Sequence, residues 1–491
     1  MKKPKQNKGL QAASVADFDP RKQAIRTFFD GLAEERDDWV RRNEFFYAAD
    51  RDYMRFLIPQ GAHVLELGCG TGQLLASLDP ARGIGLDISE GMIDIARSKY
   101  PNLKFHVGDM EDSSVIASLK GPFDAIVLTD TIGMLGDIES TLRLLRHLCT
   151  PETRIIIAYY SQLWNWPLSV AGKLGNKMPQ VAQSWLSPTD IAQLLSLADF
   201  DVVKFDWRQI VPKRLFGAGT FLNRYVGSLP GIRHLSLRNY VVARMQPSKP
   251  KAPKSVTVLI PCRNERGNIE PAIKRIPDFC PDIEVLFVEG HSQDGTLDEI
   301  NRVIEAYPDR DIKGMVQPGK GKGDAVRAGF DAARGEVLMI LDADLTVPPE
   351  TLPNFFNAIA SGKGEFVNGT RLIYPMEKRA MRFLNKIANR SFSAIFSWLI
   401  SQRLTDTLCG TKVLSKRHYE MIAANRSYFG DFDPFGDFDL IFGASKLNLK
   451  IIEVPIRYAD RAYGSTQISR FRDGWQLIKM VVFAFRKLKA F

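Results

Sequence analysis

Cysteine and histidine are scarce in this chain of 491 residues, which contains five cysteines and six histidines. The cysteines are Cys69, Cys149, Cys262, Cys280 and Cys409. They form no CxxC pair and have no metal-ligand spacing with the histidines, so the sequence indicates neither a zinc site nor a disulfide framework. We therefore expect a protein of the reducing cytoplasm.

Long apolar runs are also missing. The longest, such as Ser393 to Ile400 and Met480 to Phe485, fall far short of the roughly 20 residues that a membrane-spanning helix needs. The start of the sequence, residues 1–9, is rich in lysine but lacks the apolar core of a secretory signal. We expect a cytoplasmic protein, and any membrane contact should be peripheral, on the inner face of the membrane.

The composition is that of a folded, basic protein. Hydrophobic residues make up 45% and charged residues 25%, which are ordinary values for globular proteins. A chain of this length favours two domains rather than one. The formal net charge of +10 and the pI near 9.2 favour an anionic partner. Charge alone leaves nucleic acid, an acidic membrane face and phosphorylated substrates open.

Short β-prone runs alternate with amphipathic stretches in both halves, which predicts two α/β domains built from βαβ units. Between them, Pro247 to Lys254 is rich in proline and lysine and cannot pack into a core. The predicted parts are a basic flexible leader (1–20), a first domain (21–246), a linker (247–254), a second domain (255–470) and a basic amphipathic helix (471–491). Each domain should therefore carry its own site.

The predicted strands follow from these runs. In the first domain they are His63–Leu67, Gly83–Leu86, Leu103–Val107, Phe123–Leu128, Arg154–Tyr159, Phe200–Trp207 and Tyr240–Ala243. In the second they are Ser255–Ile260, Glu284–Val288, Lys313–Gln317, Val337–Leu341, Glu365–Asn368 and Lys450–Val454.

The first glycine-rich motif is Val64-Leu-Glu-Leu-Gly-Cys-Gly-Thr-Gly72, where an apolar strand runs into a turn and then a helical pattern. Glycines at such a turn allow a nucleotide cofactor to approach the backbone closely. Asp87 ends the next strand about 20 residues further on, the spacing at which a carboxylate meets ribose hydroxyls in these folds. A dinucleotide-binding domain would share this pattern.

Two further segments, Gly108-Asp-Met110 and Phe123-Asp-Ala-Ile-Val127, complete the first motif set. Together with the leading acid Glu66, they resemble class I S-adenosylmethionine-dependent methyltransferases, over Asp50 to Arg244. The resemblance implies a Rossmann-like methyltransferase fold that uses S-adenosylmethionine. It assigns Glu66, Gly68, Gly70 and Gly72 to the methionine end, Asp87 to the ribose, Asp109 and Met110 to the adenine, and Thr129 and Asp130 to the border of the pocket.

The methyl acceptor stays open, because methyl transfer from a sulfonium depends mostly on positioning and needs no strong base. The stretch from Tyr159 to Trp185 would shape the acceptor pocket and is rich in aromatic residues. These aromatic side chains either contact an acceptor or belong to the core.

The second motif set begins with Pro261-Cys-Arg-Asn-Glu265 and Glu289-Gly-His-Ser-Gln-Asp-Gly-Thr296, each after a predicted strand. It continues with Gly319-Lys-Gly-Lys-Gly-Asp324 and ends with Asp342-Ala-Asp344 after a fully apolar strand. Two carboxylates so placed can hold one hard divalent ion that bridges diphosphate oxygens. The order therefore predicts a metal-dependent diphosphate site.

These elements resemble family 2 glycosyltransferases of the GT-A fold, over Ser255 to Ser469. Segments such as Asp406-Thr-Leu-Cys-Gly-Thr-Lys412 and Ile452-Glu-Val-Pro-Ile456 further resemble the branch that transfers sugars to polyprenyl phosphates. The resemblance implies a nucleotide-sugar donor and Mg²⁺ or Mn²⁺. It assigns Pro261, Asn264, Glu265, Glu289 and Asp324 to the nucleotide, and Asp342 and Asp344 to the metal and the diphosphate.

The acceptor decides which further residues matter. For a hydroxyl acceptor, Asp437 is the candidate base and Asp439 the alternative, and the reaction inverts the anomeric carbon. A phosphate acceptor is already ionised, and guanidinium groups suit its oxygens. In that case Arg371, Arg461 and Arg470 are the candidate acceptor-binding residues.

The C-terminal helix and residues 381–404 carry apolar side chains at helical spacing with lysine and arginine between them. Such helices either lie in an anionic membrane interface or pack on the sheet with their cations in water. No segment resembles a nucleic-acid module, so no nucleic acid is expected.

The two motif sets together predict a bifunctional enzyme that methylates and transfers a sugar to a lipid-linked or other glycan acceptor in cell-envelope synthesis. The alternative is a glycosyltransferase with a soluble acceptor and a methyltransferase-like domain that only binds its ligand. The sugar, the nucleobase, the methyl acceptor and the oligomeric state stay open.

Overall fold

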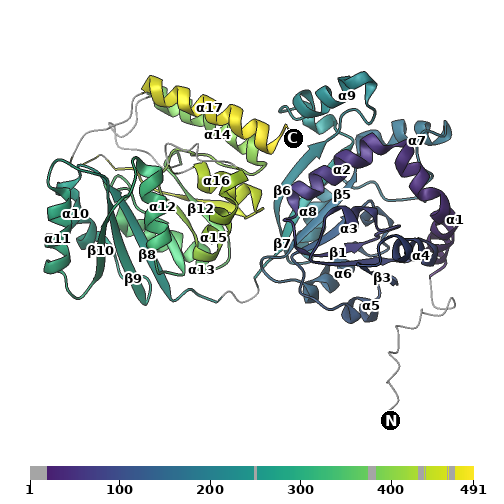
Figure 1. The fold of residues 1–491 in the computed structure, drawn as a ribbon, viewed down its shortest axis with the longest axis horizontal. Coiled ribbons are helices and arrows are strands. Elements are labelled where there is room, and N and C mark those ends of the chain that lie inside the picture. The colour runs from purple at the N-terminus through teal and green to yellow at the C-terminus, as the bar shows by residue number, and fades with distance from the viewer. Residues whose placement is uncertain are drawn as a thin grey trace, which may run out of the picture. The chain divides into compact units, whose positions relative to one another are not determined.

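The computed structural model describes residues 19–247, 251–373, 383–428, 436, 438–459, 461, 463 and 470–490, without the side chains of 383–388 and 470–473. The chain divides into two compact units, residues 1–246 and 247–491. Each unit has its own seven-stranded sheet (Figure 1). Each unit also has its own buried core. The α/β class predicted for both halves is confirmed.

The first sheet has the order β3-β2-β1-β4-β5-β7-β6. β3, β2, β1, β4 and β5 are parallel, whereas β7 runs antiparallel to both β5 and β6. The seven predicted runs agree with the strands to within a few residues. The strands are β1 (His63–Leu67), β2 (Arg82–Asp87), β3 (Lys104–Val107), β4 (Ala125–Thr129), β5 (Arg154–Tyr160), β6 (Phe200–Arg208) and β7 (Arg238–Met245).

Helices flank this sheet, and α1 begins where Asp19 accepts a hydrogen bond from the Arg21 amide and Pro20 opens the first turn. Two stretches depart from the βα alternation: the α7 segment (residues 161–187) after β5, and the α9 segment (residues 209–237) between β6 and β7. The helices are α1 (Pro20–Arg42), α2 (Glu44–Leu57), α3 (Gln73–Ser77), α4 (Glu90–Lys99), α5 (Ser113–Ser118), α6 (Ile138–Leu145), α7 (Asn165–Lys173), α8 (Pro188–Leu197) and α9 (Ala218–Phe221).

The second sheet has the order β10-β9-β8-β11-β13-β12-β14. The short strand β13 is antiparallel to β11 and β12 and was not predicted. Its first residue, Lys412, is fully buried, so the stretch lacks the apolar pattern of a central strand. The strands are β8 (Ser255–Cys262), β9 (Asp282–Glu289), β10 (Asp311–Val316), β11 (Val337–Ile340), β12 (Phe366–Thr370), β13 (Lys412–Ser415) and β14 (Ile451–Pro455).

The helices of the second unit include both segments with the basic amphipathic pattern, α14 and α17. They contact each other, and the rings of Trp398 and Phe485 stack with centroids 5.6 Å apart. Among the described residues, no helix is long and apolar enough to span a membrane. The helices are α10 (Arg266–Arg275), α11 (Thr296–Ala306), α12 (Lys322–Ala332), α13 (Leu352–Ala360), α14 (Phe383–Ile400), α15 (Lys416–Ala424), α16 (Phe438–Lys446) and α17 (Arg470–Leu488).

Candidate functional site

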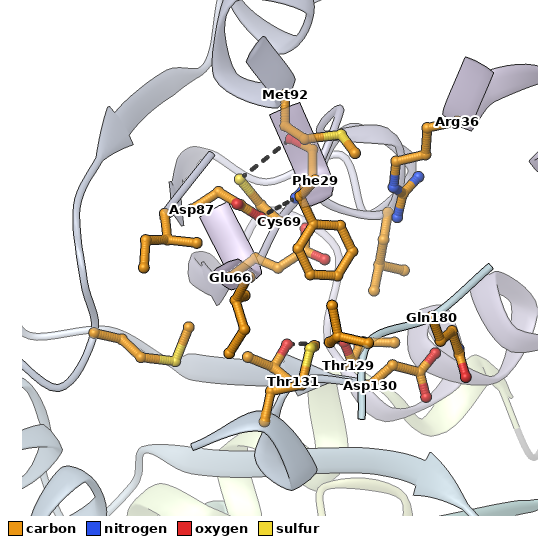
Figure 2. Close-up of a pocket in the computed structure, with 18 of the residues that line it drawn as sticks. Phe29, Arg36, Glu66, Cys69, Asp87, Met92, Thr129, Asp130, Thr131 and Gln180 are labelled. Atoms are coloured by element: carbon orange, nitrogen blue, oxygen red, sulfur yellow. Dashed lines mark hydrogen bonds between the residues drawn. The ribbon is translucent and has the colours of Figure 1, made fainter. Parts of the chain in front are cut away.

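A pocket of about 1410 Å³, open to solvent, lies in the first unit where the carboxyl ends of β1 to β4 meet. Parallel strands bring their carboxyl ends to one edge of a sheet, and ligands bind there in open α/β folds. Figure 2 shows side chains from several elements pointing into this space. The predicted cofactor residues that line it are Glu66, Gly68, Gly70, Asp87, Asp109, Met110, Thr129 and Asp130.

The turn after β1 has positive φ at Gly68 (+75°) and Gly70 (+52°), a backbone region that favours glycine. A side chain would also find no room there. A Cβ at Gly68 would lie 2.3 Å from Thr131 Oγ1, and one at Gly70 would lie 2.8 Å from Arg36 Nε. Gly72 is different: it precedes α3, and a Cβ there would meet Phe105 rather than the pocket.

Two buried carboxylates accept hydrogen bonds from the backbone of this region. Asp87 accepts hydrogen bonds from the amides of Gly70 (2.8 Å) and Ser89 (2.9 Å). Glu66 accepts one from the amide of Leu75 (3.0 Å). Burial raises the pKa of Glu66 to about 8, although the nearby guanidinium of Arg36 lowers it. Glu66 therefore changes its protonation state slightly above neutral pH.

A lysine of α1 forms ion pairs with the pocket residues that follow β3. Lys22 donates to Asp109 and also lies 3.1 Å from Glu111. Partial burial would lower the pKa of Lys22, but its bonds to the two carboxylates raise it. Asp109 also accepts from the amide of Glu111 (2.9 Å), and Met110 contributes a buried apolar wall beside it.

A buried charge network supports the wall after β4. Arg238, which is fully buried, donates to Asp50 through Nε (3.1 Å) and Nη2 (3.2 Å) and also pairs with Asp130. Burial raises the pKa of Asp130 against the effect of Arg238. The neighbouring hydroxyl of Thr129 is buried without a hydrogen-bond partner in the described part of the chain. The pocket thus presents an unpaired hydroxyl beside a carboxylate.

Helix α1 supplies pocket residues that the sequence did not indicate. Its residues Lys22, Phe29 and Arg36 all line the pocket, and Figure 2 shows Phe29 near Glu66 and Arg36 further along the pocket wall. Ile25, Phe28, Phe29 and Leu32 recur at helical spacing, which indicates a helix but not which face of the sheet that helix covers. Arg36 lies close to the glycine turn, since a Cβ at Gly70 would be 2.8 Å from its Nε.

In the second unit, hydrogen bonds join the loops that follow β8, β9 and β10. The Asn264 amide donates to Ser292 Oγ (2.9 Å), and the Glu265 amide donates to Thr296 Oγ1 (3.0 Å). Glu289 accepts from the amides that follow it, and Asp324 accepts from the Gly319 amide (2.7 Å). Pro261 is the second-last residue of strand β8, just before these loops. The predicted nucleotide residues thus lie on these connected loops or at the ends of the elements beside them.

The two aspartates after β11 each hold a side-chain cation. Asp342 lies 2.7 Å from Lys322 Nζ, and Asp344 lies 2.5 Å from Arg461 Nη2. Gly410 approaches so closely that a Cβ there would lie 2.0 Å from an oxygen of Asp342. No cluster of three or more metal-ligating side chains occurs in the described ranges. The two aspartates still fit Mg²⁺ or Mn²⁺, because such ions keep few protein ligands and take phosphate or water oxygens for the rest.

The predicted acceptor-binding and catalytic residues lie in different surroundings. Arg371 is nearly buried and forms a bidentate pair with Asp406 (2.6 and 2.8 Å). Asp439 is buried in the first turn of α16 and accepts from Arg426 (3.0 Å). Asp437 and the side chain of Arg470 lie outside the described residues. These roles stay predictions.

Comparison with known families assigns the two units separately. The family model for a methyltransferase domain matches residues 40–204, and the model for glycosyl transferase family 2 matches residues 257–431. Each match falls inside one of the two units.

Curated relatives resemble only part of this chain. A dolichol-phosphate mannosyltransferase of Pyrococcus furiosus is 29% identical over 219 residues, which are 43% of this chain and 59% of the relative. A polyprenol monophosphomannose synthase of Mycolicibacterium smegmatis is 27% identical over 249 residues, which are 49% of this chain and 89% of the relative. The chain thus spans somewhat over half the length of the first and most of the second.

Among solved structures, a methyltransferase of Thermotoga maritima, described as a possible histamine N-methyltransferase, matches 45% of this chain and 99% of its own. The identity is 18% and the TM-score is 0.35. At this similarity, the family model alone supports the assignment of the first unit.

Proposed function

We propose that this chain, which joins a methyltransferase domain to a glycosyltransferase family 2 domain, transfers a methyl group at its first site and a sugar at its second. The observation that carries the proposal is that each unit gathers carboxylates at the carboxyl edge of its own sheet: Glu66 and Asp87 in one, Asp342 and Asp344 in the other. Because the cores are separate, each activity should be removable without the other.

For the first site we propose S-adenosylmethionine, which supplies an electrophilic methyl group when it is bound. The glycine turn supports this because Gly68 and Gly70 carry no side chain and have positive φ, so a cofactor can approach their backbone closely. Glu66 and Asp87 suit a cationic ligand with ribose hydroxyls, and Thr129 offers an unpaired hydroxyl. Because the sulfonium is a good leaving group, these residues act by holding the cofactor in line with an acceptor.

For the second site we propose a nucleotide-sugar donor, with mannose as the first candidate because both curated relatives are named for mannosyl transfer. Asp342 and Asp344 would hold a divalent ion, which neutralises diphosphate charge when bound. Both aspartates already pair with side-chain cations, Lys322 and Arg461, so this position favours positive charge. Lys322, between the glycines of its loop, is a further candidate for contact with the diphosphate.

For the acceptor we propose a polyprenyl phosphate or a related lipid-linked glycan, as in the relatives' names. Asp437 is the candidate base for a hydroxyl acceptor and Asp439 the alternative, whereas Arg461 suits a phosphate acceptor. Helix α17 supports peripheral contact with the inner membrane face. It buries Leu477 and Met480 but exposes Trp475, Ile478 and Val482, with Lys479 and Arg486 on the same outer side.

The test uses two full-length variants with opposite expected losses. Gly70→Arg should abolish binding of S-adenosylmethionine, measured by calorimetry, and leave sugar transfer intact. Asp344→Asn should reduce transfer from GDP-mannose to polyprenyl phosphate, with Mn²⁺ present, roughly a hundredfold or more and leave cofactor binding intact. Asp309→Asn, an exposed acid of the second unit, is the control.

The outcomes separate the alternatives. If the wild-type chain binds neither S-adenosylmethionine nor GDP-mannose or UDP-glucose with metal, the proposal is wrong. If it transfers sugar and binds the cofactor but methylates no lipid, glycan or soluble extract, the first unit is a binding domain.

A further inference from the structure

The α7 segment and the α9 segment have an unusual charge composition. Together they contain six lysines and arginines but no aspartate or glutamate. Acidic residues number 56 of 491 in the whole chain, so about six would be expected in stretches of this length. The basic residues are Lys173, Lys177, Lys213, Arg214, Arg224 and Arg233.

Helix α7 has apolar side chains on two opposite sides. On the inner side, Leu168 packs in a small core with Phe46 of α2, Tyr160 and Leu237. On the outer side, the exposed fraction is 77% for Trp166 and 70% for Leu174. Leu163 and Val170 are exposed at the same helical spacing. This outer face is apolar and has no partner among the described residues.

The α9 segment exposes a second group of large apolar side chains. Phe216 is fully exposed and has φ +54°, a backbone region that costs a phenylalanine free energy. Phe221 and Tyr225 lie one helical turn apart and are both exposed, as is Leu235. Among the described residues, no contact of the Phe216 side chain offsets this free-energy cost. A contact with a molecule outside this chain would offset it.

The two segments meet, and together they form what we call the apolar-basic face. The indole Nε1 of Trp164 donates to the carbonyl of Leu235 (2.9 Å), which joins the start of one segment to the end of the other. Both segments are visible as α7 and α9 in Figure 1. Lys173, Lys213 and Arg224 are exposed on them. Large exposed apolar side chains gathered in one place with basic residues around them are typical of an interaction surface.

The α7 segment also reaches the cofactor pocket. Its later residues Met178, Gln180 and Gln183 line the pocket described above. Trp185 and Asp130 line a small hollow next to it, together with the buried Tyr159 and Tyr160. One segment therefore carries both the outer apolar face and part of the wall where a methyl acceptor would enter.

We infer that the apolar-basic face docks the methyltransferase unit on an anionic lipid surface, so that its methyl acceptor is a membrane-borne molecule. Exposed tryptophan, phenylalanine and leucine suit the headgroup boundary, and lysines and arginines without any acid suit anionic lipids. Docking on lipid is inferred only from the exposed side chains of the apolar-basic face. The membrane-borne acceptor, by contrast, rests on the proposed methyl transfer.

The test separates this face from α17 by starting from a full-length chain that carries Trp475→Ser, Ile478→Ser and Val482→Ser. We expect this chain still to float with vesicles of phosphatidylcholine and phosphatidylglycerol (3:1). Adding Trp166→Ser, Leu174→Ser, Phe216→Ser and Phe221→Ser should lower the bound fraction roughly tenfold or more. The matched control, Leu197→Ser, removes an exposed leucine elsewhere in the same unit and should change nothing.

A second variant, which changes charge only, tests the proposal even if the serine variant misfolds. Lys213→Glu with Arg224→Glu, in the same background, should weaken vesicle binding by roughly fivefold for each residue. Vesicles of phosphatidylcholine alone should bind all of these chains weakly. Unchanged affinity for S-adenosylmethionine indicates that the pocket is intact.

Four results overturn the inference or part of it. Equal flotation of the serine variant and its background refutes docking. A dimer in solution that the same substitutions dissociate, without vesicle binding, makes the face a contact between copies of this chain. Failure to bind S-adenosylmethionine at all refutes the proposed methyl transfer and leaves the docking result standing. Docking with methylation confined to the aqueous fraction of a lipid extract refutes the membrane-borne acceptor.

Discussion

Replacing Glu66 by glutamine tests the electrostatics of the first site directly. Glutamine keeps the shape and an oxygen that accepts from the Leu75 amide, but it cannot ionise. The pKa of Glu66 is about 8 in the folded chain, above the ordinary value of 4.5 expected after unfolding. Between these two pH values, the folded state holds a proton that the unfolded state has lost. The free energy of unfolding therefore falls as the pH rises through this window and levels off above pH 8.

The magnitude follows from the width of the window. One proton changes the free energy of unfolding by about 1.4 kcal/mol per pH unit, so the whole window is worth at most about 5 kcal/mol. Glu66→Gln should match the wild type near pH 5 and be more stable by several kcal/mol at pH 8.5. Hydrogen exchange during a urea titration, read in peptides that cover β1, reports this for the first unit alone. Glu34→Gln, an exposed acid on α1, is the control.

Ligand binding adds a second readout. S-adenosylmethionine carries positive charge at its ammonium and sulfonium groups, which favours ionised Glu66. Near pH 7 the wild type should release close to one proton on binding, and Glu66→Gln should release none. Calorimetry in two buffers with different ionisation enthalpies measures this count. Parallel pH profiles of stability for the wild type and Glu66→Gln would refute the reasoning, whatever the ligand does.

Three further predictions concern other parts of the chain. Arg238→Met leaves the buried carboxylate of Asp50 and the partly buried carboxylate of Asp130 without their cation. It should lower the free energy of unfolding by about 3–5 kcal/mol, measured by urea denaturation. Lys322→Met frees Asp342, so the Mn²⁺ concentration that half-saturates sugar transfer should fall while the KM for the donor rises. Trp475→Ser in an otherwise wild-type chain should weaken flotation with anionic vesicles without changing sugar transfer to a short-chain acceptor in detergent.

Each of these has its own control and contrary result. Arg55→Met breaks an exposed pair with Asp52 and should cost less than about 1 kcal/mol; an equal loss for Arg238→Met would show that the network is not buried in solution. A rise in the Mn²⁺ requirement of Lys322→Met would contradict competition between the lysine and the metal. Leu297→Ser, an exposed leucine of α11, should leave flotation unchanged, and the same result for Trp475→Ser would remove α17 from the membrane contact.

Much of the fold could be read from the sequence because the strands are apolar and regularly spaced. The runs around β1, β4 and β8 predict the strands to within a few residues, and each ends in a polar or glycine-rich loop. β13 escaped prediction because its buried Lys412 interrupts the apolar pattern. Its place between β11 and β12 depends on pairing with strands distant in sequence, which no local pattern encodes.

The sites were predictable in part for a similar reason. Asp87 and Asp344 end or follow apolar strands, so the sequence placed them at the carboxyl edge of a sheet. Arg36 was missed because it lies on a helix whose packing face the spacing of residues does not fix. The exposed aromatic residue Trp166 was predicted to be either core or acceptor contact, and it is neither buried nor in the pocket.

The sequence by itself determined the two-part organisation, the α/β class and the residues at the strand ends, because these depend on local order along the chain. Only the tertiary structure decided that Arg36 lies over the glycine turn, that Lys322 and Arg461 neutralise the two aspartates, and that the α7 and α9 segments form one apolar face without acids. Contacts between distant segments set charge pairing and exposure, and no stretch of sequence specifies its partners alone.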